Sequence, residues 1–338
     1  MTAPAAIVCF GELLLRLTPP GAQLMVQADS LDLAVGGAEA NVAAALASLG
    51  HAVRFAGAVS DNALGDRAVA ALRGAGVNTA HLTRAKGRMG LYFMERGSGS
   101  RPSAIVYDRA DSAFANAAPG AIDFAGALTG ARVLHTGGIT PALGSGGVEL
   151  AKAAQAAADA AGVPVCFDGN YRGQLWEPWN SDPSSVLREL VAGATILIGN
   201  HRDISLLLGT MFSGDGEDRR REAAEAAFAA FPKLSLIAST ARHLVTSAHH
   251  RFTARVDSRT TSHQTGEIDV TGIVERIGTG DAFTAGVLHA WVEGGDIQAM
   301  ADTGLALCAL KHTIPGDMCL INRAALAGFD PAAGDVRR

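Results

Sequence analysis

Residues 274–286 read VERIGTGDAFTAG and place a glycine–threonine–glycine triplet directly before Asp281 and a helix-forming run. Two glycines this close permit backbone conformations and close approaches that side chains forbid. An aspartate at such a junction has two interpretations. It can be an N-cap, whose carboxylate accepts hydrogen bonds from the first free backbone amides of the helix. It can also be a catalytic carboxylate beside an anion site formed by those amides.

The composition is that of a packed globular protein. The chain has 338 residues, enough for one large α/β domain or two ordinary ones, with 48% apolar residues and 12 prolines. Its net charge of −5 offers no basic surface for a phosphate backbone, so we expect no nucleic-acid partner. The opening MTAPAAIVCFGE carries no basic leader, and Glu12 interrupts its apolar run. We therefore expect neither a signal peptide nor a membrane span.

The cysteines indicate a reducing compartment. Cys9 and Cys166 lie in apolar, strand-like runs, where a buried reduced thiol is the usual state. These two, Cys308 and Cys319 form no CxxC pair. We expect a cytoplasmic protein without a zinc site.

Short apolar runs alternate with alanine-rich helical segments along most of the chain. Because the runs are apolar on both faces, they are typical of strands buried in a parallel sheet. Helical segments cover residues 41–49 and 148–161, and a glycine ends each of them. The alternation predicts an α/β fold with a doubly wound, mostly parallel sheet and helices on both faces. The predicted strands are residues 6–10, 53–58, 132–137, 163–168, 195–199 and 234–239.

Two segments break this alternation. Residues 13–37 and 87–110 read as hairpin-like strands, with turn signals at TPPG and GSGSRP. We expect them to form a small β-sheet lid, from about 12–36 and 88–110, on a single domain that spans residues 1–338. The outer face of such a sheet needs covering, which favours a homodimer or a higher homo-oligomer.

A double glycine precedes the first predicted helix. GGAEANVAAALASLG places Gly36 and Gly37 before that helix and Asn41 in its first turn. The pattern fits a glycine turn with a solvated asparagine. It fits equally well an asparagine that hydrogen-bonds a ligand hydroxyl, and the residues alone leave both interpretations open.

Polar side chains follow two neighbouring predicted strands. FDGNYRGQLW places Asp168, Asn170 and Arg172 after one strand, and GNHRD places Asn200 and Asp203 after the next. In open α/β sheets, ligands bind beyond the carboxyl ends of the strands. The convergence of these polar strand ends predicts a binding site at that edge.

Two other polar stretches have ordinary explanations. YDRADSAF carries Tyr107 and Arg109 out of the predicted lid, where the arginine fits either a surface position or a ligand contact. His249 and His250 follow HLVTSA in what reads as a tight turn. We expect both histidines to be exposed and not to hold a metal.

Taken together, these motifs resemble the ribokinase-like carbohydrate kinases of the phosphofructokinase B type over nearly the full chain. The resemblance rests on GGAEAN near the start and IGTGDAFTAG near the end. Within that family the chain is most similar to 2-keto-3-deoxygluconate kinases, through GLYFME, YDRADSAF, LHTGGITPALG, FDGNYRGQLW and ALKHTIPGD. The resemblance implies a three-layer αβα fold with a β lid, and ATP bound in a shallow groove.

The resemblance also implies roles for particular residues. Asp281 matches the catalytic base, and the amides of Gly278, Thr279 and Gly280 match an anion hole. Substrate contacts are implied for Gly36, Gly37, Asn41, Tyr92, Tyr107, Arg109, Ile139, Arg172 and Asp317. Nucleotide contacts are implied for Asn170, Asn200, Thr240 and Arg242, and water-mediated Mg²⁺ binding for Asn200 and Asp203.

Three positions depart from the family pattern. Asn200 is followed by Asp203 where the family usually has N-x-x-E, which is one methylene longer. Glu275 stands where many members have an aspartate that helps to build a potassium site, so no monovalent ion is assigned and its requirement stays open. IASTARHLVTSAHH replaces the usual lysine-and-glycine-rich nucleotide loop, and Thr240 and Arg242 are its candidate substitutes.

Phosphoryl transfer gives the GTGD stretch a chemical purpose. The reaction needs positioning and stabilisation of charge on the transferred oxygens, which amides at a helix N-terminus supply together with the helix dipole. The same dipole favours an ionised Asp281, ready to accept the proton of the attacking hydroxyl.

The leading hypothesis is therefore an ATP-dependent and magnesium-dependent kinase of 2-keto-3-deoxygluconate, or of its galacto epimer, that acts on the terminal hydroxyl. The alternatives are a neutral-sugar kinase such as a fructokinase and a sugar-binding sensor without turnover. A dinucleotide-binding protein is a weaker alternative, because FGELLL after the first strand lacks the glycine fingerprint.

Overall fold

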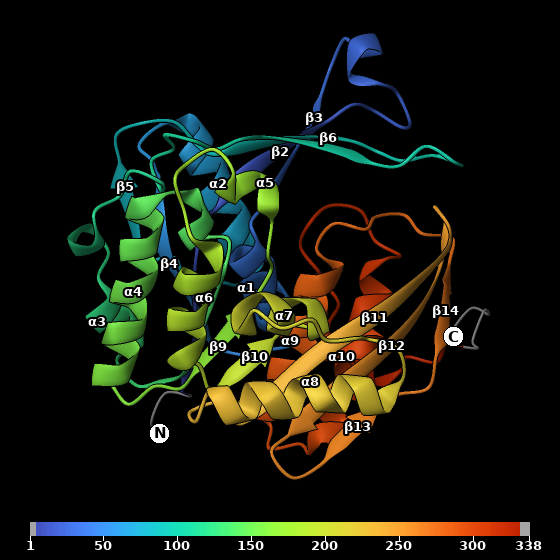
Figure 1. The fold of residues 1–338 in the computed structure, drawn as a ribbon. Helices are drawn as coiled ribbons and strands as arrows, with labels where there is room; N and C mark the ends of the chain where they lie inside the picture. Colours follow the sequence, from blue (N-terminus) through green and yellow to red (C-terminus); the bar gives the residue numbers. More distant parts are fainter. Residues whose placement is uncertain (1–4, 332–338) are drawn as a thin grey trace.

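A 10-stranded sheet forms the centre of the molecule (Figure 1). The structure is a computed structural model that describes residues 5–331. The strand order is β13-β12-β11-β10-β9-β8-β1-β4-β5, with β14 also paired to β12. The strands from β5 to β11 in this order are parallel, whereas β12 pairs antiparallel with β11, β13 and β14. The strands are β1 (Ala6–Phe10), β4 (Val53–Ser60), β5 (Leu82–Ala85), β8 (Ala131–Gly137), β9 (Val165–Asp168), β10 (Ile196–Ile198), β11 (Leu236–Thr246), β12 (His249–Ser258), β13 (Ser262–Gln264) and β14 (Ile268–Thr271).

Helices pack on both faces of this sheet. One apolar cluster joins β1 and β4 to α1 (Ala38–Ser48), α2 (Ala63–Gly74), α9 (Thr279–Val292) and α10 (Ile297–Lys311). Two clusters on the other face involve α3 (Phe124–Leu128), α4 (Ser145–Ala160), α5 (Gly173–Trp176), α6 (Pro183–Ala192), α7 (His201–Leu208) and α8 (Glu217–Ala230). The short helix α11 spans Arg323–Ala327, and the 3₁₀ turns η1, η2 and η3 span Met25–Gln27, Pro119–Ala121 and Pro141–Leu143. Strands with both faces buried require two helical layers, and the predicted three-layer αβα fold is confirmed.

A second sheet stands apart from the central one (Figure 1). This outer sheet contains β2 (Leu14–Thr18), β3 (Asp32–Gly36), β6 (Leu91–Glu95) and β7 (Ala104–Asp108), in the order β3-β2-β6-β7. Each predicted hairpin pairs antiparallel within itself, and β2 joins the two hairpins by pairing parallel with β6. Tyr92 and Met94 face an inner apolar cluster, whereas the Val106 side of the sheet is exposed. The small separate sheet expected from the sequence is therefore present.

The expectation of two exposed histidines is wrong for His250. His249 and His250 begin β12, and successive side chains of a strand point to opposite faces. His249 stays at the surface and forms a 2.5 Å contact with Asp269. His250 is fully buried and lies near the rings of Phe252 and His312.

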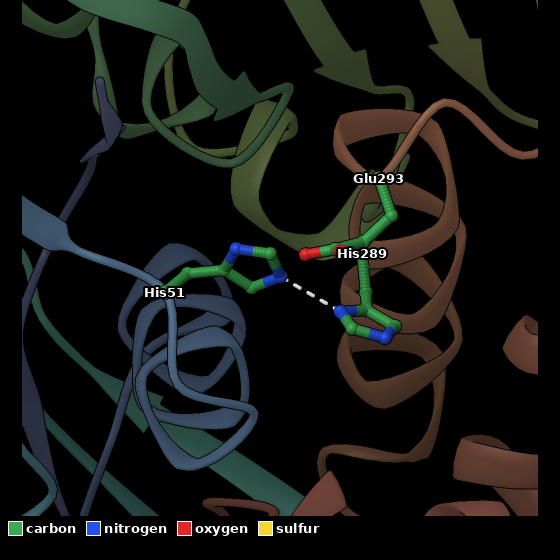
Figure 2. Close-up of side chains that lie close together, drawn as sticks. All are labelled: His51, His289 and Glu293. Carbon is green, nitrogen blue, oxygen red and sulfur yellow. Dashed lines mark hydrogen bonds between the residues drawn. The ribbon is translucent and has the colours of Figure 1, made fainter. Parts of the chain in front are cut away.

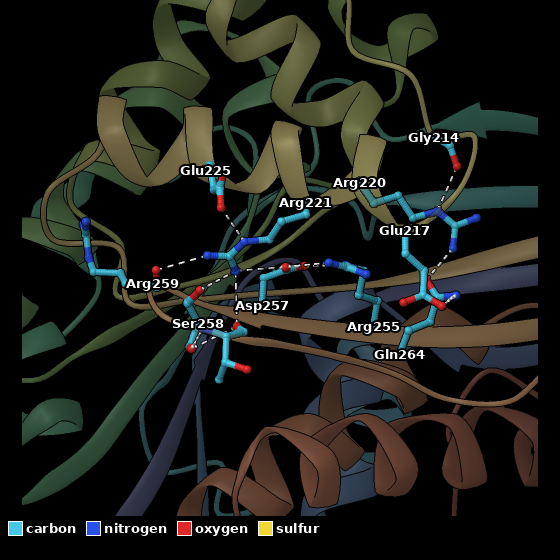
Figure 3. A network of polar contacts seen from close by, with 11 residues as sticks. Gly214, Glu217, Arg220, Arg221, Glu225, Arg255, Asp257, Ser258, Arg259 and Gln264 are labelled. Carbon is cyan, nitrogen blue, oxygen red and sulfur yellow. Dashed lines mark hydrogen bonds and ion pairs between the residues drawn. The ribbon is translucent and has the colours of Figure 1, made fainter.

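Helix α8 is bound to the antiparallel edge of the sheet by arginines (Figure 3). Arg221 of α8 contacts Glu225 on its own helix, and Asp257 and the Ser258 carbonyl on β12. Asp257 also forms a buried pair with Arg255 at 2.8 Å. These bonds hold the β11–β12 hairpin, which carries Thr240 and Arg242, two of the four residues predicted to contact a nucleotide.

All four cysteines are buried free thiols, as was expected for Cys9 and Cys166. Within residues 5–331, none of the helices combines the length and apolar character needed to cross a bilayer.

The close contact between α9 and α10 depends on Gly286. An ideal Cβ on Gly286 would lie 2.7 Å from the Thr303 carbonyl oxygen and 2.8 Å from Gly304 Cα. Gly286→Ala should therefore destabilise the fold by about 1–3 kcal/mol through overpacking, although alanine has the better helix propensity. Urea unfolding measures this change.

Gly74→Ala at the end of α2 is the matched control, because a Cβ there meets no atom of the described chain within 4 Å. We expect its stability to equal or exceed that of the unmodified protein. An unchanged urea midpoint for Gly286→Ala would contradict the packing described here.

Candidate active site

A cavity of about 590 Å³ lies between the outer sheet and the carboxyl ends of the central strands. Its walls include Met94 and Tyr107 from the outer sheet, Asp168 at the end of β9 and Ser239 within β11. The predicted site residues that line it are Gly37, Asn41, Tyr92, Tyr107, Arg109, Ile139, Asn170, Arg172, Asn200, Asp203, Thr240, Arg242, Gly278, Thr279, Gly280, Asp281 and Asp317. Residues that are far apart in sequence thus share one cavity.

Gly36 is the one predicted site residue that is not part of the cavity wall. An ideal Cβ on Gly36 would lie 2.1 Å from Asp317 Oδ2. The glycine therefore makes room for the Asp317 carboxylate, which itself lines the cavity. The substrate contact expected of Gly36 stays a prediction.

The start of α9 has the geometry of an anion site. Gly278 is its N-cap residue in the left-handed region, at φ +80°, and a Cβ there would lie 1.9 Å from the Asp317 carbonyl oxygen. Only glycine fits this position. Thr279 and Gly280 open the helix and line the cavity, and amides of a first helical turn have no acceptor within their own helix. The site can thus hold an anion against backbone N–H groups.

Asp281 is the third residue of α9 and is not its N-cap. Its Oδ2 accepts a 2.7 Å hydrogen bond from Asn41 Nδ2, so the predicted ligand contact Asn41 also holds this carboxylate. Burial raises the pKa of Asp281 to about 6, while the Asn41 bond and the charges of Arg172 and Lys311 lower it. The group is still mainly ionised at neutral pH, with a pKa suited to a general base.

An ion-pair network forms the wall between the outer sheet and the start of α9. Arg16 of β2 is buried and pairs with Glu275 at 2.7 Å and with Asp317 at 3.1 Å. Tyr92 donates a 2.5 Å hydrogen bond from its hydroxyl to Asp317 Oδ2. Two predicted substrate contacts, Tyr92 and Asp317, are thus bonded to each other within this network.

The two predicted substrate arginines differ in their surroundings. Arg109 is buried, and its Nε and Nη2 both contact Glu12 Oε2, at 2.8 and 2.5 Å. Its two-pronged edge is therefore occupied by a carboxylate of the protein itself. Arg172 is exposed to the cavity and donates from Nε to Asn170 Oδ1 at 3.0 Å. Arg172 is thus the better placed of the two to bind a carboxylate ligand.

Asn200 and Asp203 form a capping box at the start of α7. Asn200 Oδ1 accepts from the Arg202 amide, and Asp203 Oδ2 accepts from the Asn200 amide, each at 2.8 Å. Both side chains thus have a structural role that the magnesium prediction did not include. Asp203 and Asp168 have raised pKa values because of burial, followed in Asp168 by the charges of neighbouring carboxylates.

Comparison with known proteins agrees with this site. Residues 4–320 match the family described as pfkB family carbohydrate kinase. The chain belongs to this family. The kinase is 32% identical over 319 residues to a protein of Haloferax volcanii named 2-dehydro-3-deoxygalactonokinase, with 94% of each chain covered. It is also 30% identical over 285 residues to the 5-dehydro-2-deoxygluconokinase of Shouchella clausii, with 82% of this chain and 81% of that protein covered.

Solved structures show the same similarity. The crystal structure of 2-dehydro-3-deoxygluconokinase from Thermotoga maritima matches the kinase with a TM-score of 0.90 and 35% identity. The match covers 96% of this chain and 98% of the other.

Glu12 and Arg16, described above, were not identified as site residues from the sequence, and neither were two further charged residues, Glu39 and Lys311. Glu39, inside GGAEAN, is buried in a slot where a Cβ on Gly11 would lie 2.1 Å from its Oε2. Burial raises the pKa of Glu39 to about 7. Lys311, inside ALKHTIPGD, is fully buried; its Nζ donates to the Ile314 carbonyl, and its Cε would lie 3.3 Å from a Cβ on Gly278. The sequence shows that both motifs contain a charged residue. It does not show that each charged side chain is buried against a glycine.

The activity of the kinase should fall on the acid side as Asp281 takes up a proton. A general base works only when deprotonated, so kcat should be full above pH 7 and fall as pH drops through about 6. Asn41→Ala removes a hydrogen bond that lowers this pKa, so the midpoint of the fall should move to higher pH.

The comparison between variant and unmodified protein cancels the titration of the substrates themselves. Asn322→Ala, at the N-cap of α11, is the control and should leave the midpoint in place. An identical midpoint in Asn41→Ala and Asn322→Ala would show that Asp281 does not set the acid limb.

Proposed function

We propose that this kinase transfers the γ-phosphoryl group of ATP to the terminal hydroxyl of 2-keto-3-deoxygluconate or of its galacto epimer. The observation that carries the proposal is one cavity that holds Asp281, the N-terminus of α9 and the exposed Arg172. The names of the Haloferax and Thermotoga relatives support a keto-deoxy sugar acid as the substrate class.

The residues divide the chemistry between them. The substrate hydroxyl oxygen attacks the γ-phosphorus and its proton passes to Asp281, while the bond from phosphorus to ADP breaks. The amides of Thr279 and Gly280 stabilise the negative charge on the transferred oxygens, helped by the helix dipole. Catalysis rests on positions fixed before the substrate arrives.

The nucleotide side of the cavity fits a phosphorylated, magnesium-bound donor. Thr240 and Arg242 of β11 line it, together with Asn170 and Asn200. Asp168 and Asp203 supply carboxylate oxygens at the cavity wall, the ligand type that Mg²⁺ prefers. We assign Mg²⁺ to Asp203 and Asn200 through water, with Asp168 beside them; the ion would neutralise phosphate charge.

Arg172 separates a sugar-acid kinase from a neutral-sugar kinase. Proteins named fructokinase also match the chain, one from Arabidopsis thaliana at 28% identity over 287 residues. A neutral sugar has no carboxylate to pair with a cavity arginine. The cavity-exposed guanidinium of Arg172 therefore favours the acid.

The outer sheet is proposed to act as a lid. Tyr92, Met94 and Tyr107 place the inner face of the sheet against the cavity, so closure over a sugar would exclude water from the reaction. Val106, which is 64% exposed, lies on the other face and supports the expected homodimer through that face. The free cysteines support a cytoplasmic location.

Asp281→Asn should abolish phosphoryl transfer without unfolding the protein, because the amide keeps the shape but cannot accept the proton. Loss of a general base lowers kcat by roughly two to four powers of ten. Steady-state ADP release, with thermal melting as the control for folding, measures this. Turnover within threefold of the unmodified protein would remove Asp281 from the role of base, and an unmodified protein without turnover would favour the sensor.

Arg172→Leu should weaken kcat/KM for 2-keto-3-deoxygluconate by roughly 10- to 150-fold. A hydrogen bond to a charged group contributes roughly 1.5–3 kcal/mol, and about 1.4 kcal/mol corresponds to tenfold. Activity toward fructose should hardly change, because fructose carries no carboxylate. Arg172→Lys should recover only part of the loss, since an ammonium lacks the planar fork.

Arg67→Leu, on the exposed side of α2, is the control and should leave both substrates unaffected. Arg109→Leu is a poorer test, because it would leave Glu12 buried without its partner. If the unmodified protein prefers fructose, or if Arg172→Leu lowers kcat/KM equally for both substrates, the neutral-sugar assignment replaces this one.

A further inference from the structure

Two histidines and a glutamate meet away from the cavity (Figure 2). His51 follows the C-terminal end of α1, while His289 lies in the last turn of α9 and Glu293 is the C-cap residue of that helix. Figure 2 shows the His51 ring directed at the His289 ring, with the Glu293 carboxylate beside them. His51 Nε2 and His289 Nδ1 are 2.7 Å apart, and one ligand atom from each of the three residues lies within 4.8 Å of the others.

The distances suit a small cation. Two imidazole nitrogens bound to one tetrahedral zinc ion at 2.0–2.1 Å are about 3.3 Å apart. The two rings would have to separate by roughly half an ångström from their present hydrogen-bonded contact, which small side-chain rotations provide. Two histidines and one glutamate, with water in the fourth position, form a ligand set that zinc uses in proteins.

Arg323 is the main opposing charge. Its Nη2 pairs with Glu293 Oε1 at 2.7 Å, and its Nε donates to the Leu49 carbonyl oxygen. This ion pair is exposed, and surface pairs of this kind contribute little to stability. Arg323 holds the Glu293 side chain in position through Oε1. Because Oε2 takes no part in this ion pair, the carboxylate can pair with Arg323 and bind a metal ion at the same time.

We propose that His51, His289 and Glu293 bind one Zn²⁺ ion per chain. The ion would join the C-terminal end of α1 to α9. At their other ends, the same two helices are joined by the hydrogen bond between Asn41 and Asp281. The site is remote from phosphoryl transfer and serves as a clamp on the two helices that build the active site. The sequence-based expectation of no zinc site rested on cysteines and did not consider these ligands.

Zinc titration of the full-length protein tests the proposal. The protein is freed of metal with EDTA, dialysed into a buffer without chelator and titrated with ZnCl₂ by calorimetry. We expect one equivalent to bind, and the melting temperature to rise with zinc concentration, because a ligand of the folded state stabilises it. Co²⁺ in place of Zn²⁺ should give the visible absorption of a tetrahedral, histidine-bound ion.

His51→Ala and His289→Ala should each lower the affinity at least about tenfold and remove the cobalt absorption, and Glu293→Gln should weaken binding less. His249→Ala is the matched control: His249 also contacts a carboxylate, that of Asp269, but lies outside the cluster. This variant should bind zinc as the unmodified protein does.

Melting of every variant without metal checks that each one folds. The proposal is overturned if the unmodified protein binds less than one equivalent, or if His51→Ala and His289→Ala bind as tightly as His249→Ala. Neither result depends on kinase activity, so failure here leaves the proposed substrate untouched.

Discussion

The 2.7 Å hydrogen bond from Asn41 to Asp281 is the contact on which the site depends. It joins α1 to α9, and each helix enters the site through a glycine with a positive φ. A Cβ on Gly37 would lie 2.2 Å from the Glu12 carbonyl oxygen, and one on Gly278 would lie 1.9 Å from the Asp317 carbonyl oxygen. The backbone can approach this closely only at glycine, and that approach brings the base and the free amides into one cavity.

Neighbouring cationic side chains partly offset the burial of the carboxyl groups at the cavity. Glu39, Asp168 and Asp281 all have pKa values raised chiefly by burial. An isolated buried charge would be costly, but Arg109 lowers the pKa of Glu39, Arg172 that of Asp168 and Lys311 that of Asp281. Arg16 is buried as well and pairs with Glu275 and Asp317. The result is a carboxylate with a pKa near neutrality beside a helix end that attracts phosphate.

The sequence predicted the fold, and which residues line the cavity, better than it predicted individual hydrogen bonds and ion pairs. Apolar runs identify buried strands, and glycine pairs identify the helix starts, because both signals are local. The partner of Arg109 is Glu12, 97 positions away, and the partner of Arg16 is Glu275, 259 positions away. Such pairs leave no periodic trace in one sequence. The prediction that His250 is exposed was wrong for a related reason, since only the register of β12 decides which of two adjacent histidines is buried.

The most direct test of the account is to identify the phosphorylated product. After incubation of the kinase with ATP, Mg²⁺ and 2-keto-3-deoxygluconate, ³¹P NMR should show a new phosphomonoester beside ADP. Its proton-coupled signal should be a triplet, because a phosphate on the terminal carbon couples to two protons. A doublet would place the phosphate on a secondary carbon, and inorganic phosphate without an ester would indicate hydrolysis. Either outcome would contradict an Asp281 positioned to activate the terminal hydroxyl.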